Sequence, residues 1–370
     1  MKKIGIITFH RAKNYGAVLQ TYALARAMRE LGADCEVVDF WTKYLKKASR
    51  LIRFDGAKLK WRFKNLARCL QYLGYNMRRR NRCFRFVEKH VPLSAPVTEK
   101  SVAAYCEERY RALITGSDQV FNAYYTGVHL KNYLLSFVPE SVERYSYAAS
   151  VGSHIDRITE EEKELYIREW NKFKDLSIRE SNGVALVKEL TGRDAHLHLD
   201  PTLLVRAEQW AELCEKPKQE SHYILMYMIF NSTAAYEYAQ QLSASTGMPV
   251  YCILGSAIKK ARKVPFKIRY IRDCSPEQFL GLVQGASQVI TTSFHGTVFS
   301  IQFRKPFVAF LSKKNKTDDR IETLLKLTGL ESRLWSQDFH DTGEIDWEYA
   351  DRQLDVEREK AKEYLRGIIA

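Results

Sequence analysis

The sequence predicts an α/β protein made of two Rossmann-like domains that face one another across a cleft. Three observations support this prediction. The chain has 370 residues, enough for two domains at roughly 150 residues each. Short apolar segments alternate with amphipathic ones, as in parallel sheets whose strands are joined by helices. A polar stretch at residues 214–221, which contains Pro217, interrupts that alternation and indicates a linker.

The first domain is expected over residues 1–213. It opens with a strand at 4–8, a helix at 17–31 that Gly32 ends, and a second strand at 35–40. This strand–helix–strand order predicts a parallel sheet. The later elements predicted in this domain are strands at 112–115, 144–149, 176–180 and 197–199 and a helix at 160–173.

The second domain is expected over residues 221–340, where the same alternation repeats and predicts a second parallel sheet. A long charged helix at 348–368 follows it within the C-terminal segment 341–370. The elements predicted in the second domain are strands at 223–230, 250–254, 268–271, 288–292 and 307–310 and helices at 234–246, 276–284 and 296–302. In sheets of this kind, ligands bind at the carboxyl ends of the strands.

The composition excludes several classes of protein. Hydrophobic residues make up 45% of the chain and aromatic residues 12%, too many for a disordered or collagen-like chain. The seven cysteines are odd in number and form no CxxC pair, so neither a disulfide framework nor a zinc knuckle is indicated. The N-terminus lacks a signal peptide, and no apolar run approaches the ~20 residues that span a bilayer. We therefore expect a soluble, cytoplasmic protein.

The basic charge is concentrated in one segment, residues 43–90, which we interpret as a helical insertion in the first domain. The net charge is +14, and this segment holds 16 basic residues against two acidic ones, so the rest of the chain is neutral. Apolar residues recur there at helical spacing: Leu59, Phe63, Leu66, Leu70 and Leu73. Such a segment suits either a helix pair packed on the body or peripheral contact with an anionic membrane. Nucleic acid is a less suitable partner, because no recognition motif accompanies the charge.

The sharpest local feature is the end of the strand predicted at 288–292. The chain continues as Ser293-Phe294-His295-Gly296-Thr297, so hydroxyls and a histidine stand where a helix begins. Backbone N–H groups at a helix start favour anions, and His295 would lie beside the anion as a general acid or base. The alternative is a buried histidine that the backbone satisfies.

Three other segments carry candidate residues. Asp118 directly follows the strand at 112–115 and could deprotonate a hydroxyl or cap the next helix. Arg179 could bind a carboxylate or phosphate with two hydrogen bonds, or pair with its neighbour Glu180. The first turn, with Asn14 and Gly16, exposes backbone amides but is no GxGxxG motif, which disfavours a dinucleotide.

A metal site is the weaker interpretation of His196, His198 and Asp200, which share one face of a predicted strand. The sequence offers no further ligand beside them, so we predict no metal and no cofactor.

Six motifs in order give the chain a family resemblance. They are Asn14-Tyr15-Gly16-Ala17-Val18-Leu19-Gln20, Gly116-Ser117-Asp118-Gln119-Val120-Phe121-Asn122, Ser146-Tyr147-Ala148-Ala149-Ser150, Ser177-Ile178-Arg179-Glu180, Asp200-Pro201-Thr202 and Thr292-Ser293-Phe294-His295-Gly296. Across most of its length the chain resembles the polysaccharide pyruvyl transferase family.

The resemblance implies a fold and a reaction. The fold is that of the two-domain GT-B glycosyltransferases, in which the last helix, here within 341–370, crosses back to the first domain. The implied reaction transfers a pyruvyl group from phosphoenolpyruvate to two hydroxyls of a sugar, giving a cyclic ketal. The acceptor is a polysaccharide or a lipid-linked saccharide, which the basic segment 43–90 would suit at the inner face of the membrane.

The resemblance also implies roles for individual residues. His295 matches the family's histidine, the expected general acid, and Asp118 is our candidate for the base. The residues expected to bind the donor are Arg179, Ser293, Gly296, Thr297 and Lys305, and those expected on the acceptor side are Asn14, Gly16, Gln20 and Gln119.

One departure from the family pattern leaves the donor open. Many members have Arg-Leu-His-Gly where this chain has Ser293-Phe294-His295-Gly296. Either Arg179 and Lys305 suffice to hold the anion, or the donor is not phosphoenolpyruvate. The competing interpretations are a GT-B glycosyltransferase that uses a nucleotide sugar, and a non-catalytic protein that binds membrane or nucleic acid through its basic segment.

Overall fold

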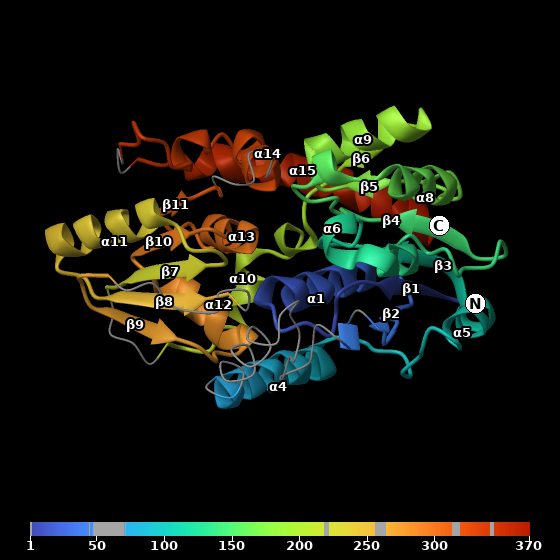
Figure 1. The fold of residues 1–370 in the computed structure, drawn as a ribbon, viewed down its shortest axis with the longest axis horizontal. Coiled ribbons are helices and arrows are strands. Elements are labelled where there is room, and N and C mark those ends of the chain that lie inside the picture. The colour runs from blue at the N-terminus through green and yellow to red at the C-terminus, as the bar shows by residue number, and fades with distance from the viewer. Residues whose placement is uncertain are drawn as a thin grey trace, which may run out of the picture.

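The computed structural model describes residues 2–43, 45–46, 70, 72–217, 222–255, 264–312, 319–340 and 344–370. It contains two α/β units side by side, each with one parallel sheet between helices (Figure 1). The predicted fold class is confirmed. Within the described ranges, no helix combines the length and the apolar character that crossing a membrane requires.

The first unit contains a four-stranded parallel sheet in the order β2-β1-β3-β4. Its strands are β1 (Lys3–Ile7), β2 (Cys35–Val37), β3 (Tyr110–Thr115) and β4 (Glu143–Ser146). A two-stranded parallel sheet, β5 (Ser177–Ile178) and β6 (His196–Leu197), continues its edge. The central strands β1 and β3 are almost wholly buried, as expected for a parallel sheet covered on both faces.

The helices of this unit begin and end where local sequence favours it. The first helix, α1, begins after Asn14, whose side chain accepts a hydrogen bond from the Gly16 N–H at 3.0 Å. The chain then turns at Gly32, which has a φ of 90° that favours glycine. The longer helices are α1 (Tyr15–Glu30), α4 (Leu73–His90), α5 (Val102–Arg109), α8 (Glu160–Trp170) and α9 (Ser181–Thr191); the shorter ones are α6 (Ala123–Thr126), α7 (Leu130–Tyr133) and α10 (Ala207–Ala211).

The second unit has a five-stranded parallel sheet in the order β11-β10-β7-β8-β9. Its strands are β7 (Ile224–Met228), β8 (Val250–Leu254), β9 (Ile268–Ile271), β10 (Gln288–Thr291) and β11 (Phe307–Ala309), and its helices are α11 (Thr233–Thr246), α12 (Pro276–Gly285), α13 (Phe294–Gln302) and α14 (Asp319–Thr328). The bounds predicted for β8 and β9 are confirmed. The strand order reverses between β7 and β10, and a crevice at such a switch point is the usual ligand site of a doubly wound sheet.

The last helix, α15 (Trp347–Ile369), connects the two units. It contacts α14 in the second unit. Farther along, the Tyr364 hydroxyl donates to the Ser146 carbonyl at 2.8 Å, and Arg111 donates to the Ile368 carbonyl at 3.0 Å. The helix therefore returns to the first unit, as the GT-B resemblance implies (Figure 1).

The described part of the basic segment is a packed helix. Helix α4 contacts both α1 and α12, and it buries Cys83, Phe86 and Val87. The Arg11 guanidinium of the first unit donates to Glu88 on this helix at 2.6 Å. Helix α4 thus fits the interpretation of a helix packed on the body, whereas the helical pattern at 59–66 lies outside the described residues.

We predict that His198 makes stability fall as the pH drops below about 6.5. The ring is buried beside Tyr147 and Tyr364, and this burial lowers the His198 pKa to about 4. Between these values the unfolded chain binds a proton that the folded one does not, so stability is lost as the pH falls, by about 3 kcal/mol in full. Urea unfolding between pH 7 and pH 4 should show a shallower loss in His198→Gln than in wild type and in His340→Gln, an exposed control. Parallel profiles would contradict this assignment.

Candidate active site

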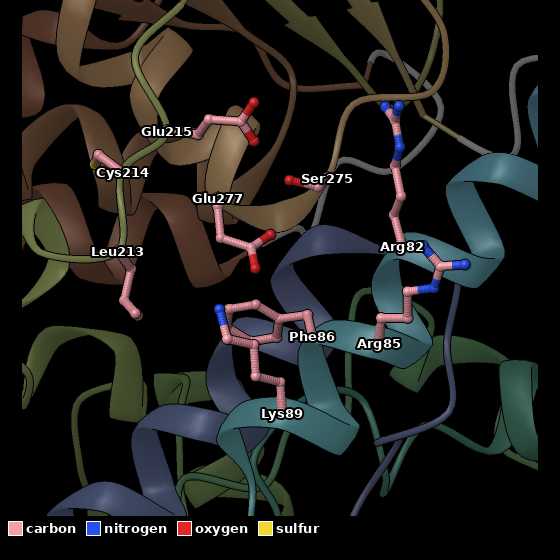
Figure 2. Close-up of a pocket in the computed structure, with 9 residues that line it drawn as sticks. All are labelled: Arg82, Arg85, Phe86, Lys89, Leu213, Cys214, Glu215, Ser275 and Glu277. Carbon is pink, nitrogen blue, oxygen red and sulfur yellow. The ribbon is translucent and has the colours of Figure 1, made fainter.

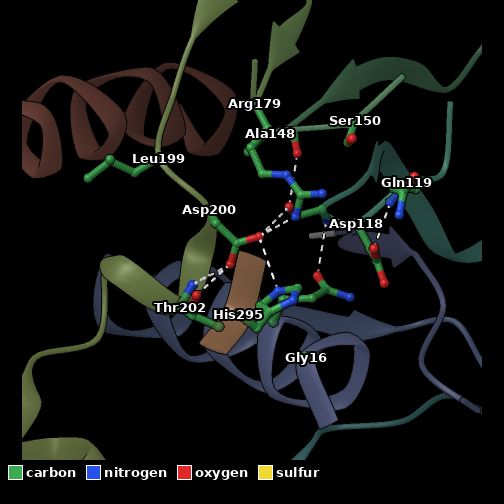
Figure 3. Close-up of polar contacts among 12 residues, drawn as sticks. Gly16, Asp118, Gln119, Ala148, Ser150, Arg179, Leu199, Asp200, Thr202 and His295 are labelled. Carbon is green, nitrogen blue, oxygen red and sulfur yellow. Dashed lines mark hydrogen bonds and ion pairs between the residues drawn. The ribbon is translucent and has the colours of Figure 1, made fainter. Parts of the chain in front are cut away.

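The candidate site lies where the carboxyl ends of the two sheets meet. Helix α13 follows β10 in the second unit, and α1 follows β1 in the first. Gly16 in the first turn of α1 lies directly against His295 in the first turn of α13 (Figure 3). A Cβ atom at position 16 would come within 2.1 Å of the His295 Nδ1. The absence of a side chain at Gly16 therefore permits this contact between the units.

Both helix starts carry positive electrostatic potential. Ser293 precedes α13, and its hydroxyl accepts a hydrogen bond from the Gly296 N–H at 3.4 Å. The Thr297 hydroxyl donates to the Ser293 carbonyl at 3.2 Å, so it is occupied within the helix. Neither α1 nor α13 has an acidic residue in its first turn. The two N-termini therefore offer partial positive charge that no carboxylate within their own first turns offsets.

Asp200 is the central acceptor of the site. Its Oδ2 lies 2.6 Å from Arg179 Nη1 and 3.1 Å from the Ser117 hydroxyl, and its Oδ1 accepts from the Thr202 N–H and hydroxyl at 3.0 and 2.6 Å. The His295 Nε2 lies 3.6 Å from the same Oδ2, beyond hydrogen-bond distance (Figure 3). Asp200 therefore links the first unit to the histidine of the second.

The Asp200 carboxylate is held in its ionised form. Burial alone would raise the Asp200 pKa, but the charges of His295 and Arg179 and a hydrogen bond from Thr202 bring it well below its ordinary value. A buried negative charge therefore lies 3.6 Å from the His295 ring.

Arg179 has hydrogen-bonding capacity left for a ligand. Its side chain is buried, with its Cζ 4.6 Å from the centre of the Phe294 ring. Its Nε and Nη2 are both buried without a hydrogen-bond partner. The Glu180 Oε2 is 3.9 Å from Nε, while Glu180 Oε1 is bonded to Ser150 and to the backbone of Val151 and Gly152. Two unused donors on one guanidinium suit a carboxylate or a phosphate.

The structure brings Asp118 and Gln119 to the same sheet edge. Asp118 is the third residue after β3, has a φ of 71°, and accepts a hydrogen bond from the Gln119 N–H at 2.8 Å. The Gln119 side chain accepts from the Asn122 amide at 2.7 Å. Asp118 retains its other carboxylate oxygen for a hydroxyl. Both residues appear beside Arg179 in Figure 3.

Two of the predicted site residues, Gln20 and Lys305, do not place a free polar group at this edge of the sheets. Gln20 is fully buried: its amide donates to the Thr8 hydroxyl at 2.9 Å, and its carbonyl accepts from the Ser117 N–H at 3.1 Å. The Gln20 side chain therefore holds the Ser117 backbone in place through a hydrogen bond. Lys305 lies beyond Gln302, the last residue of α13, which is itself about 10 Å along the helix from His295 at 1.5 Å per residue. We therefore leave Lys305 out of the site, whereas Asn14 is exposed at the start of α1.

The paired histidines are engaged elsewhere. His198 Nδ1 bonds with the Ser177 hydroxyl at 2.8 Å, and His196 Nε2 lies 3.1 Å from Asp175. Among the residues that the structure describes, no group of three His, Cys, Asp or Glu side chains is arranged to hold a metal ion.

A separate surface groove of about 380 Å³ lies between α4, α12 and the end of the first unit (Figure 2). Its lining includes Arg82, Arg85 and Lys89 but also Glu215 and Glu277. The mixed charge gives it no clear preference for an anion.

Asp200 is the functional residue that the sequence analysis did not single out. Its motif Asp200-Pro201-Thr202 was noted, but its carboxylate was considered only as a metal ligand. The available signal is a short predicted strand followed by Asp and Pro, which places an acceptor at the carboxyl edge of the sheet.

Comparison with solved structures defines the class of the protein. A putative UDP-N-acetylglucosamine 2-epimerase from Listeria monocytogenes matches with a TM-score of 0.52 and 10% identity, over 99% of this chain and 91% of that one. S. aureus MnaA with UDP matches at 0.48 and 11%, over 98% and 90%, and E. coli ADP-heptose LPS heptosyltransferase II at 0.38 and 10%, over 97% and 99%. At such identities only the fold is informative, and it is of the GT-B type.

Comparison by sequence defines the family. A family model described as polysaccharide pyruvyl transferase matches residues 14–314, most of the chain. The chain belongs to the polysaccharide pyruvyl transferase family, and it is an enzyme of this type. No curated protein sequence matches it.

Proposed function

We propose that the protein transfers a pyruvyl group from phosphoenolpyruvate to two hydroxyls of a saccharide, forming a pyruvate ketal. The observation that carries this proposal is the buried guanidinium of Arg179, whose Nε and Nη2 have no hydrogen-bond partner beside His295. The N-termini of α1 and α13 add partial positive charge at the same place. A small donor that carries both a carboxylate and a phosphate suits this arrangement.

The residues support a balanced reaction. His295 gives a proton to the methylene carbon of phosphoenolpyruvate, which makes the neighbouring carbon electrophilic. A saccharide hydroxyl attacks that carbon and passes its proton to Asp118. A second hydroxyl then displaces phosphate, so its C–O bond replaces the bond to phosphate oxygen. The methyl group keeps the proton from His295, and the proton of the second hydroxyl leaves with phosphate. Return of the first hydroxyl's proton from Asp118 to His295 through solvent restores both residues, so two hydroxyl protons balance the new C–H bond and the protonated phosphate.

The acceptor side is proposed along the first unit. Exposed Asn14 and the partly exposed Gln119 offer amide groups near Asp118, and amides are suitable partners for sugar hydroxyls. We propose a lipid-linked saccharide as acceptor, presented at the inner membrane face near the basic segment 43–90. Attachment to anionic liposomes tests this step; attachment no stronger than to neutral ones would contradict it.

Thermal unfolding with candidate donors tests the proposed function. A ligand at 100 times its dissociation constant stabilises the fold by about 2.7 kcal/mol. We expect phosphoenolpyruvate to raise the unfolding temperature more than phosphate or sulfate does. This increase should be lost in Arg179→Gln and retained in Arg304→Gln. Arg304 is an exposed arginine at the far end of α13. A shift with UDP or a nucleotide sugar alone would instead favour the glycosyltransferase.

We predict that Gly16→Ala lowers kcat by about ten- to a hundredfold, less than or equal to the ~10²-fold lower bound for complete loss of a proton-transfer role, because the His295 ring is displaced rather than removed. The added Cβ would meet the His295 ring at 2.1 Å and displace it from Asp200. Phosphate release from phosphoenolpyruvate, with an acceptor that the wild type uses, measures the effect. Gly367→Ala is the control, because a Cβ at this exposed position of α15 meets nothing within 4 Å. Equal rates in the two variants would refute this prediction.

A further inference from the structure

A second buried arginine lies close to the site, on the helix from the basic segment. Arg79 of α4 is 4% exposed. Its Nη1 donates to the Leu254 carbonyl at 2.7 Å, and its Cζ lies 4.3 Å from the centre of the Tyr15 ring. Leu254 is the last residue of β8, so Arg79 reaches the carboxyl edge of the second sheet.

The charge of Arg79 is not neutralised by a carboxylate. Among the described residues, no carboxylate oxygen lies within 4.0 Å of its guanidinium, and its Nε is buried without a hydrogen-bond partner. Burial would lower the Arg79 pKa, but Tyr15 and Tyr227 raise it on balance, so the group stays charged. An unpaired buried charge is costly to the folded protein, which raises the question of what offsets it.

The neighbours of Arg79 are also neighbours of the candidate active site. Tyr15 precedes Gly16, which lies against His295. The Tyr227 ring lies 6.3 Å from the Tyr15 ring, centre to centre, and a Cβ atom at Gly296 would come within 3.0 Å of the Tyr227 ring. Two short routes of contact therefore join Arg79 to the start of α13.

We propose that Arg79 is a second cation of the donor site and that its charge is offset by the bound donor. This inference rests on the proposed function and deepens it: with Arg179, the site has two buried guanidinium groups for a ligand with two anionic groups. Helix α4 thus contributes to the donor site as well as to packing. Because Arg79 is buried, water and salt screen its charge only weakly. Its attraction for a bound anion is therefore stronger than that of a surface arginine.

Calorimetric titration of the full chain with phosphoenolpyruvate, and separately with inorganic phosphate, tests this proposal. We expect Arg79→Met to weaken binding of phosphoenolpyruvate by about tenfold or more, as for loss of a charge-assisted interaction. Arg79→Lys should keep most of the affinity, because it keeps the charge. Arg85→Gln, an exposed cation on the same helix, should bind as wild type does.

Two further readouts separate this role from a structural one. The Arg79→Met effect should persist in ~0.5 M KCl, where surface charges are screened, and the ligand-free variant should unfold at or above the wild-type temperature. Unchanged binding by a folded Arg79→Met, or equal losses in the Lys and Met variants, would overturn the proposal. The wild type could instead bind phosphate, lose that binding in Arg79→Met, and not bind phosphoenolpyruvate. That result would support Arg79 as a cation of the anion site and would exclude phosphoenolpyruvate as the donor.

Discussion

Replacing His295 with glutamine is expected to lower kcat for pyruvyl transfer by about 10²–10⁴-fold, the usual range for loss of a general acid. Glutamine retains hydrogen-bonding capacity but cannot deliver a proton at the methylene carbon. The ring lies 3.6 Å from Asp200 and against Gly16, so its position between the two units is fixed. Binding of phosphoenolpyruvate should weaken far less than kcat, because Arg179 remains.

The assay follows phosphate release with an acceptor that the wild type uses. His340→Gln provides the control, since His340 is exposed in the second unit. The pH dependence of kcat gives an independent readout. The decrease in kcat with rising pH that accompanies deprotonation of the general acid should be absent from His295→Gln only. If His295→Gln retained kcat within a few-fold, His295 would be excluded as the general acid, and a role of His295 in binding would be favoured.

Much of the fold could be predicted because its strands are buried on both faces. Strands such as β8 and β10 appear as short apolar runs between helices, and a run of this kind is visible without knowledge of its neighbours. Helices α9 and α14 were not predicted. Both nevertheless have an apolar face at helical spacing: α14 buries Ile321, Leu324 and Leu325, and α9 buries Leu186 and Val187. These faces lie toward one another in the structure.

The site was predicted only in part because its geometry arises from packing between the two units. His295, Arg179 and Asp200 come from three distant segments, and no spacing in the sequence indicates that they meet. Lys305 was included because it lies near His295 in sequence, although an intervening helix separates them. Gln20 was included for its polar group, which the fold uses to hold Ser117.

Packing also accounts for the position of Arg79. The sequence shows a run of arginines at 78–80 on a basic helix, and these are equivalent by composition. In the structure Arg78 pairs with Asp273 at the surface, whereas Arg79 is buried against Tyr15. Which arginine of the run faces inward depends on how α4 meets the second unit, so a pattern of charges alone could not single it out.

Replacing Asp200 with asparagine is expected to destabilise the fold by about 3–5 kcal/mol, the usual result of breaking a buried ion pair. Asparagine removes the closest carboxylate of the buried Arg179, which keeps only Glu180 at 3.9 Å, and it removes the anion beside His295. Because the Asp200 pKa is lowered in the folded state, its stabilising effect is present above the ordinary pKa of about 4 and is lost as the pH falls below it. Urea unfolding at pH 7 should therefore show the full difference.

A second substitution distinguishes the stabilising role of Asp200 from its proposed role in positioning His295. The double variant Arg179→Gln with Asp200→Asn removes both charges and should recover most of the lost stability, which tests the ion pair alone, since loss of the donor-binding Arg179 keeps transfer low in any case. The effect of Asp200 on transfer is therefore measured in the folded fraction of the single variant Asp200→Asn. Asp39→Asn is the matched control, since Asp39 is a buried carboxylate that pairs with His10 and Arg11 outside the proposed site. It should lose stability to a similar extent while its folded fraction retains kcat. If Asp200→Asn behaved in the same way, Asp200 would stabilise the fold without positioning the histidine.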